Sequence, residues 1–228
     1  MPPSSTKITF STTDPAGEPM QEVLTILKSM YPNPTTALRH DSPFQLLVAT
    51  ILSAQCTDER VNMITQELFP AFPTPQALAA ATFEEVAPYV RSAGLWRTKA
   101  SNLIKTAQIL VDKHDGEVPR IREELEALPG VGRKTANVVL ANAFGIPAIA
   151  VDTHVFRVAN RIGLSTASDV LETERQLMEA IPQEEWIDAH HWLILHGRAL
   201  CKARKPLCGE CPLQEHCRYY LEQDRQQE

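Results

Sequence analysis

The chain has 228 residues, of which 43% are hydrophobic, and a formal net charge of -6 at pH 7. This length allows a sizeable buried core, and no apolar stretch approaches the ~20 residues that a membrane-spanning helix needs, which excludes a helical membrane protein. The acidic balance, with a pI of about 5.7, excludes bulk attraction as the way in which the chain would hold a polyanion.

Helix signals dominate the sequence after residues 1–18, which are rich in Pro, Ser and Thr and are expected to form a disordered extension. This start lacks the apolar core of a signal peptide. Apolar spacing and capping residues predict helices over residues 19–30, 42–54, 58–69, 74–80, 82–87, 99–113, 122–128, 133–143, 152–161, 168–181 and 184–196. Alternating strand patterns are scarce, so we predict an all-α fold.

The segment between two of these helices, residues 128–136, reads LPGVGRKTA. Gly130 and Gly132, on either side of Val131, allow the backbone to turn sharply and to present its amides to an oxyanion at the start of the next helix. A tight turn between packed helices explains the glycines alone equally well. Lys134 favours a functional site over a simple turn. The helix dipole disfavours the charged form of an ammonium in the first turn, so the free amine, which is a nucleophile, is easier to obtain.

Asp152 follows an apolar stretch, residues 146–151, that is expected to be buried, and it begins the segment DTHVFR. It is expected to cap the next helix. A cap can also be catalytic, because an ionised carboxylate can orient a nucleophile or stabilise a developing oxocarbenium ion. Both roles therefore stay open for Asp152.

Four of the five cysteines lie near the end of the chain in the pattern C-x6-C-x2-C-x5-C. Without a secretory segment, clustered thiols indicate metal binding in a reducing, cytoplasmic compartment and not disulfides. Zinc is the usual ion for C-x2-C, but this irregular order also suits a compact iron–sulfur cluster. The candidate ligands are Cys201, Cys208, Cys211 and Cys217, whereas Cys56 is expected to be a small buried side chain.

Basic residues surround the first two of these cysteines, and the only acid between residues 185 and 210 is Asp188. A basic loop is a sensible contact for phosphate, although a charge run is more often only a solvated face. The basic residues are Arg198, Lys202, Arg204 and Lys205.

These motifs resemble the endonuclease III family. The resemblance rests on LPGVGRKTA, on VDTHVFRVANR at residues 151–161, on the four-cysteine tail, and on LSAQCTD at 52–58 and GLWRTKA at 94–100. It implies a six-helix lobe with a helix-hairpin-helix motif over residues 36–146. A second, discontinuous lobe of residues 19–35 and 147–228 would carry a 4Fe-4S cluster, and the active site would lie in the cleft between the lobes.

The same resemblance implies a base-excision-repair enzyme, a bifunctional DNA glycosylase and abasic-site lyase that removes oxidised pyrimidines. Lys134 would attack C1′ of a flipped-out nucleotide and form the Schiff base that permits β-elimination, and Asp152 would assist the attack and later proton transfers. The partner would be double-stranded DNA with damaged pyrimidines or abasic sites, bound by a monomer.

A base-flipping enzyme must fill the gap that the extruded nucleotide leaves in the duplex. By the resemblance, Gln55 would hydrogen-bond the orphaned base and Leu95 would wedge into the stack, although Gln55 could also be only a polar helix end. Leu95 lies in a predicted loop, where an exposed leucine is harder to explain as core. Further DNA contacts are expected at Gly130, Val131, Gly132, His154, Arg198 and Lys202.

Two alternatives remain open. A monofunctional mismatch or adenine glycosylase would share the hairpin, the aspartate and the cluster, but Lys134 and Ala54 speak against it, because the adenine enzymes have two glutamines after the serine and lack the lysine. A non-catalytic helix-hairpin-helix module that binds DNA would need neither Asp152 nor a cluster.

Overall fold

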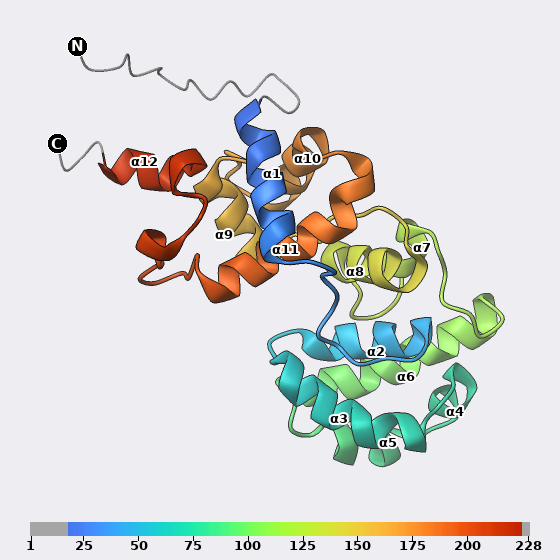
Figure 1. Ribbon diagram of the computed structural model, residues 1–228. Helices are drawn as coiled ribbons and strands as arrows, with labels where there is room; N and C mark the ends of the chain where they lie inside the picture. The colour runs from blue at the N-terminus through green and yellow to red at the C-terminus, as the bar shows by residue number, and fades with distance from the viewer. Residues whose placement is uncertain (1–17, 225–228) are drawn as a thin grey trace, which may run out of the picture. The chain divides into compact units, whose positions relative to one another are not determined.

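A computed structural model describes residues 18–224 of the protein (Figure 1). In this part of the chain all regular structure is helical, with helices α1 to α12 and three short 3-10 helices and no strand, which confirms the all-α prediction. The extension predicted over residues 1–18 lies outside the described residues, except for Glu18, which begins α1.

The chain divides into two compact units. Pro34–Ala150 forms one, called here the hairpin unit, and Met1–Asn33 with Val151–Glu228 forms the other, the cysteine unit. Lys134 therefore belongs to the hairpin unit, and Asp152 with the four clustered cysteines belongs to the cysteine unit.

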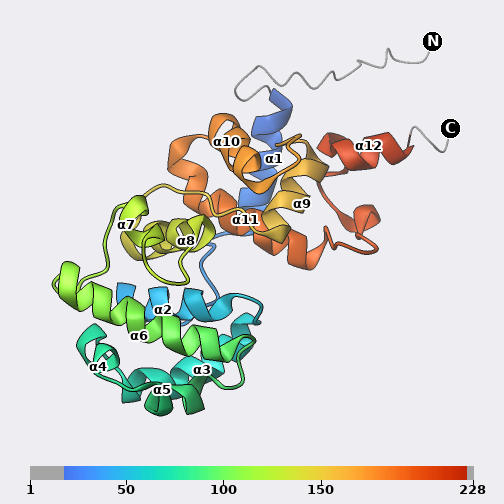
Figure 2. The same cartoon turned by 180° about the vertical axis from the view of Figure 1, so that it is seen from behind.

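The hairpin unit is built around α2 (Pro43–Ser53), whose residues from Phe44 to Leu52 are nearly all buried. Ser42 starts this helix, because its Oγ accepts a hydrogen bond from the amide of Gln45. A helix that is apolar on all sides must be covered on all sides. Its neighbours are α3 (Asp58–Ala71), α6 (Trp96–Lys113) and α8 (Arg133–Phe144), and both views show α6 running beside α2 (Figures 1 and 2).

The remaining helices of the hairpin unit are short. α4 (Pro75–Ala79) and α5 (Phe83–Val90) pack against α6, and α7 (Arg122–Glu126) packs against α8. Thr82 and Glu85 form the reciprocal hydrogen bonds of a capping box at the start of α5.

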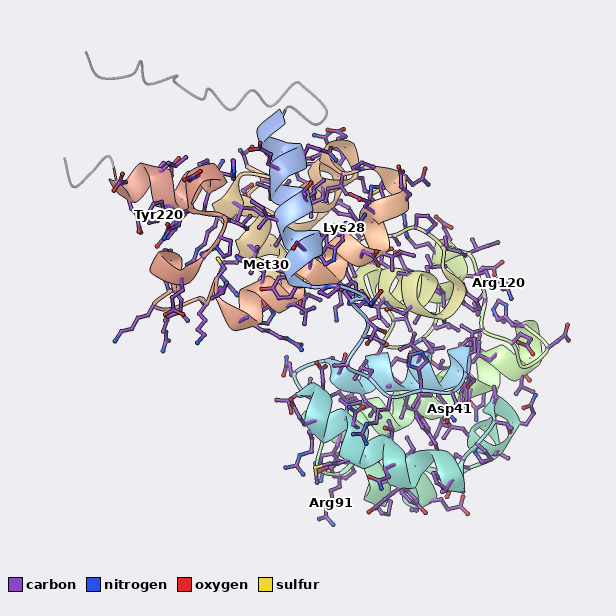
Figure 3. All side chains as sticks on the ribbon, viewed as in Figure 1. Lys28, Met30, Asp41, Arg91, Arg120 and Tyr220 are labelled. Atoms are coloured by element: carbon purple, nitrogen blue, oxygen red, sulfur yellow. The ribbon has the colours of Figure 1, made fainter. Side chains whose placement is uncertain are left out.

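The cysteine unit is organised by α11 (Trp186–Ala199), which packs against α1 (Glu18–Met30) and α9 (Thr153–Ile162) and buries Trp192. The ammonium of Lys28 on α1 (Figure 3) donates a hydrogen bond of 3.1 Å to Glu185, just before α11. α10 (Val170–Ala180) and α12 (Arg218–Asp224) both contact α9.

Two helix predictions needed correction. α6 begins at Trp96, three residues before the predicted start, and its N-cap is Leu95 in a left-handed conformation. Leucine has no polar group with which to cap a helix, so the sequence carries no start signal there. α12 was not predicted, and it buries no residue that would have made an apolar stripe.

None of the helices in residues 18–224 combines the length and the apolar character that crossing a membrane requires.

The first prediction concerns His191, which is buried on α11. Burial lowers the pKa of its imidazole from the ordinary value of 6.5, while the carboxylate of Asp188 raises it. The unfolded chain therefore takes up this proton at a higher pH than the folded chain. We expect the free energy of unfolding to fall as the pH drops below about 6.5 and to level off below the folded-state pKa.

Chemical denaturation at about pH 7.5 and about pH 5.5 measures this loss. The difference between the two pH values should shrink in His191→Asn, which cannot titrate in this range. An equal difference in both proteins would show that His191 does not cause the acid sensitivity.

Candidate active site and cysteine loop

The turn between α7 and α8 needs only one of its two glycines for backbone geometry. Gly130 has a φ of +81°, and a Cβ on it would lie 2.7 Å from Nδ2 of Asn102. Gly132 has an ordinary φ of -102°, and a Cβ there would meet nothing within 4 Å. Gly130 therefore shapes the turn, and Gly132 leaves open space in front of α8.

Hydrogen bonds from within the hairpin unit hold the rest of the turn. The hydroxyl of Thr106 on α6 donates to the carbonyl of Pro129 at 3.1 Å, and the amide of Val131 donates to the carbonyl of Leu128 at 3.1 Å. Val131 is itself buried. Among the three hairpin residues predicted to contact DNA, the exposed ones are thus the two glycines.

The start of α8 is arranged differently from most other helix starts in the protein. Gly132 is its N-cap, and no side chain in the described part of the chain caps it, whereas Ser42, Thr57, Thr74, Thr82, Asp152 and Asp169 cap theirs. The first amides of a helix have no partner inside it and can bind an anion. Lys134 is exposed at the second position of this helix, beside those amides.

Asn137, one turn further along α8, is completely buried and connects three segments. Its carboxamide oxygen accepts from Nε of Arg122 at 2.9 Å, and its nitrogen donates to the carbonyl of Ile149 at 2.9 Å. α8 is thereby bonded to α7 and to the chain that follows it. The orientation of the helix that carries Lys134 depends on these bonds.

Asp152 is the N-cap of α9, as predicted. Its Oδ1 accepts from the amides of His154 and Val155, both at 2.8 Å. Its Oδ2 lies 3.4 Å from Nδ1 of His154, but the angles are too poor for a hydrogen bond, so this is a contact between charges only when the imidazole is protonated. The cap bonds fix the carboxylate through one oxygen and leave the other oxygen for other chemistry.

Gln55 and Leu95 lie in two adjoining turns of the hairpin unit. Both have left-handed backbones, with φ of +53° and +57°, and both side chains are exposed, that of Leu95 to 60%. A Cβ on Gly94 would lie only 3.0 Å from the carbonyl oxygen of Gln55. The structure therefore brings these two predicted residues together.

Lys99 was missed by the sequence analysis. It is 4% exposed, and its ammonium donates to the carbonyls of Leu52 at 2.8 Å and Ala54 at 2.5 Å. The sequence could have revealed this buried lysine, because Lys99 lies among the positions that form the apolar side of its helix. Cys56, which was expected to be buried, is partly exposed and lies near this ammonium.

The four clustered thiols share one electrostatic environment. Burial raises the pKa of Cys208, Cys211 and Cys217, the last to about 11, and the charge of Cys201 raises each of them further. Thiols under such mutual repulsion become thiolates when a positive metal centre offsets their charge. This donor set fits a cluster held by four cysteines.

In residues 18–224, no three Cys, His, Asp or Glu side chains come close enough to hold one metal ion. A cluster of four irons is wider than one ion, so its ligands stand further apart.

His196, which is buried, contacts Sγ of Cys211 through Nε2 at 3.6 Å and hydrogen-bonds Tyr31 through Nδ1 at 3.3 Å.

The segment that carries the four clustered cysteines, residues 201–217, is called here the cysteine loop. α9 holds its start through two arginines that the sequence analysis did not single out. Nε of Arg157 donates to the carbonyl of Cys201 at 3.0 Å. Arg161 donates to the carbonyl of Lys202 at 2.7 Å and contacts Sγ of Cys201 at 3.6 Å. Their spacing of four residues on one helix, directly after Asp152, was the available signal.

The basic residues of the loop are exposed. Lys202, Arg204 and Lys205 follow Cys201, and Arg198 precedes it at the end of α11. The bonds from Arg157 and Arg161 therefore hold the backbone that carries these exposed cations.

Two family models match the chain. That of the HhH-GPD superfamily of base excision DNA repair proteins matches residues 48–183, and that of the iron-sulfur binding domain of endonuclease III matches residues 201–217. The chain belongs to the endonuclease III family of base excision repair enzymes. It is a DNA glycosylase and abasic-site lyase with a 4Fe-4S cluster, and it binds DNA.

Individual relatives agree with this assignment. Endonuclease III of Haemophilus influenzae is 54% identical over 198 residues, which are 87% of this chain and 94% of that protein. Two solved structures are similar with a TM-score of 0.84 and 49% identity: a trapped endonuclease III–DNA covalent intermediate with an estranged adenine, and a non-covalent endonuclease III–DNA complex. Each similarity covers 90% of this chain, with 99% and 98% of the respective structures.

The second prediction tests the cysteine loop. Cys208→Ala should lose most of its iron and its yellow-brown absorption, because one of four thiolate ligands is removed. Cys56→Ala is the matched control and should keep about four irons per chain. Iron analysis and visible absorption after anaerobic purification measure both. Equal iron in the two variants would remove Cys208 from the ligand set, and one zinc per chain in the unaltered protein would overturn the cluster.

Proposed function

We propose that this enzyme removes oxidised pyrimidines from double-stranded DNA and cuts the strand at the abasic site through a Schiff base on Lys134. The observation that carries this proposal is the exposed amine of Lys134 at the second position of α8, beside helix amides that no side chain caps. A phosphate on those amides would bring the sugar of the neighbouring nucleotide to the lysine.

The amine nucleophile explains both activities. Nζ of Lys134 forms a bond to C1′ of the flipped-out nucleotide while the bond from C1′ to the base breaks, and the base leaves with the electron pair. A proton then passes from nitrogen to the ring oxygen O4′ as the bond from C1′ to O4′ breaks, which opens the sugar ring and gives the imine. Removal of a proton from C2′ breaks the bond from C3′ to the 3′ phosphate, which leaves. Water as nucleophile would stop after the first step.

Asp152 is proposed to stabilise the positive charge that develops on the sugar and to carry protons in the later steps. The support is its geometry. One carboxylate oxygen is fixed by two amides of α9, which leaves the other in a set direction near His154. A carboxylate held in this way needs no reorganisation during the reaction.

The remaining site residues are proposed to hold the DNA. Gln55 and Leu95 would fill the gap behind the flipped nucleotide, and the exposed Gly130 and Gly132, on either side of the buried Val131, would bind a phosphate through the hairpin backbone. His154, Arg198 and Lys202 would contact the strand from the cysteine unit. These few local cations let a chain of net charge -6 bind a polyanion.

The cluster is proposed to be held by Cys201, Cys208, Cys211 and Cys217. When bound, the cluster holds the loop that carries the basic residues in one conformation and takes no part in bond breaking. The enzyme is proposed to act as a monomer in the bacterial cytoplasm, where reduced thiols are available for the cluster and the chromosome is accessible.

The third prediction tests Lys134. Borohydride reduces an imine to a stable bond, so the enzyme should become covalently attached to abasic DNA. Lys134→Gln should abolish this product while DNA binding changes little, because the amide backbone of the hairpin remains. Lys113→Gln, an exposed lysine of the same unit, is the control and should trap normally. Trapping at full yield by Lys134→Gln would disprove the assignment.

The fourth prediction separates catalysis from capping at Asp152. Asparagine is also a good N-cap, so Asp152→Asn should cost much less than the ~1 kcal/mol typical of a lost cap and yet slow base excision by about a hundredfold or more. The control is Asp169→Asn, because Asp169 caps α10 through two amides at 2.9 Å in the same way. Thermal unfolding and single-turnover excision are measured for both. Similar excision rates in the two variants would leave Asp152 with a structural role alone.

A further inference from the structure

Lys99 is a buried cation that the proposed mechanism does not use. Its ammonium donates to the carbonyls of Leu52 and Ala54, at the end of α2, where the last carbonyls of a helix lack partners within the helix. A lysine at a helix C-terminus supplies the missing donors and also interacts favourably with the helix dipole. The chain leaves the helix directly afterwards, since Ala54 has a ψ of 116°.

The same residue is bonded to the second turn. The backbone amide of Lys99 donates to the carbonyl of Leu95 at 3.1 Å, as the first bond of α6. Lys99 thus holds the residue before Gln55 through its side chain and Leu95 through its main chain. Lys99 is therefore a direct link between two turns that are 40 residues apart in the sequence.

Both turns need such support. A left-handed backbone is unfavourable for a residue with a Cβ, and it persists only where the surroundings impose it. Gln55 and Leu95 adopt it next to each other, with the backbone of Gly94 against the carbonyl of Gln55. Burying the ammonium of Lys99 costs free energy. Burial lowers its pKa, although the charge of Cys56 raises it.

We propose that Lys99 is a positioning residue that holds Gln55 and Leu95 side by side in the geometry in which they fill the gap in the duplex. This inference rests on the proposed roles of Gln55 and Leu95. It predicts a defect that depends on the substrate: without the ammonium, keeping a base out of a duplex becomes harder, while the chemistry of Lys134 on an abasic site in a single strand is unaffected.

The fifth prediction uses Lys99→Met, which keeps the length of the side chain and removes the donors. Single-turnover excision of an oxidised thymine from a duplex should slow at least about tenfold, and cutting of a single-stranded oligonucleotide with an abasic site should change by less than about twofold. Lys105→Met, an exposed lysine on the same helix, should leave both rates unchanged. A uniform loss on both substrates would overturn the inference.

A double-mutant cycle separates positioning from general stability. In a background of Gln55→Ala with Leu95→Ala, Lys99→Met should cause little further loss of duplex excision, because the residues through which it acts are gone. An undiminished further loss would overturn the inference. If the background variant itself excised normally, the proposed gap-filling roles would fail, which is a distinct result.

Gly94→Ala gives an independent test should Lys99→Met not fold. A methyl group there presses on the carbonyl of Gln55 at 3.0 Å and separates the two turns while the buried ammonium stays. It should reproduce the duplex defect with normal cutting of the single strand. Normal duplex excision by Gly94→Ala would show that the spacing of the turns does not matter.

Discussion

The position of Lys134 depends on one buried carboxamide. Asn137 lies a turn beyond Lys134 on the inner face of α8 and bonds both to Arg122 on α7 and to the carbonyl of Ile149. A buried amide group must satisfy its donor and acceptor, so these partners are obligatory and the two helices of the hairpin keep one relative orientation. The glycine turn and the helix amides acquire a fixed direction from this constraint. Ile149 also lies only three residues before Asp152 in the chain.

Candidate residues in each of the two units lie at helix ends. α8 starts without a side-chain cap, α9 starts with the carboxylate of Asp152, and α2 stops at the ammonium of Lys99. Helix ends are where backbone groups lack partners, so each can bind an anion, fix a side chain or receive a cation. The protein satisfies two of these ends with its own residues, and the end beside Lys134, which no side chain caps, is the one proposed to bind a phosphate of the substrate.

The charges of the protein are divided between structural and exposed cations. Arg157 and Arg161 use their guanidinium groups to bond carbonyls of the cysteine loop, and Lys99 is buried in the hairpin unit. Lys202, Arg204 and Lys205 stay exposed on the loop, and Arg198 stays exposed at the end of α11. The proposed DNA contacts therefore depend on these few local cations and not on the net charge of the chain.

The sequence alone determined the helices with polar caps, the hairpin glycines, the cap at Asp152 and the cysteine set, because each depends on residues within a few positions of each other. It did not reveal the start of α6 at Trp96, because the N-cap Leu95 has no capping group, or the partial exposure of Cys56. Only the tertiary structure decided that Lys99 joins two turns, that Gln55 adjoins Gly94, and that Arg157 and Arg161 hold the cysteine loop. Those contacts join residues 39 to 47 positions apart. Such contacts exist only after the helices have packed, since no local pattern records which distant carbonyl a buried cation will reach.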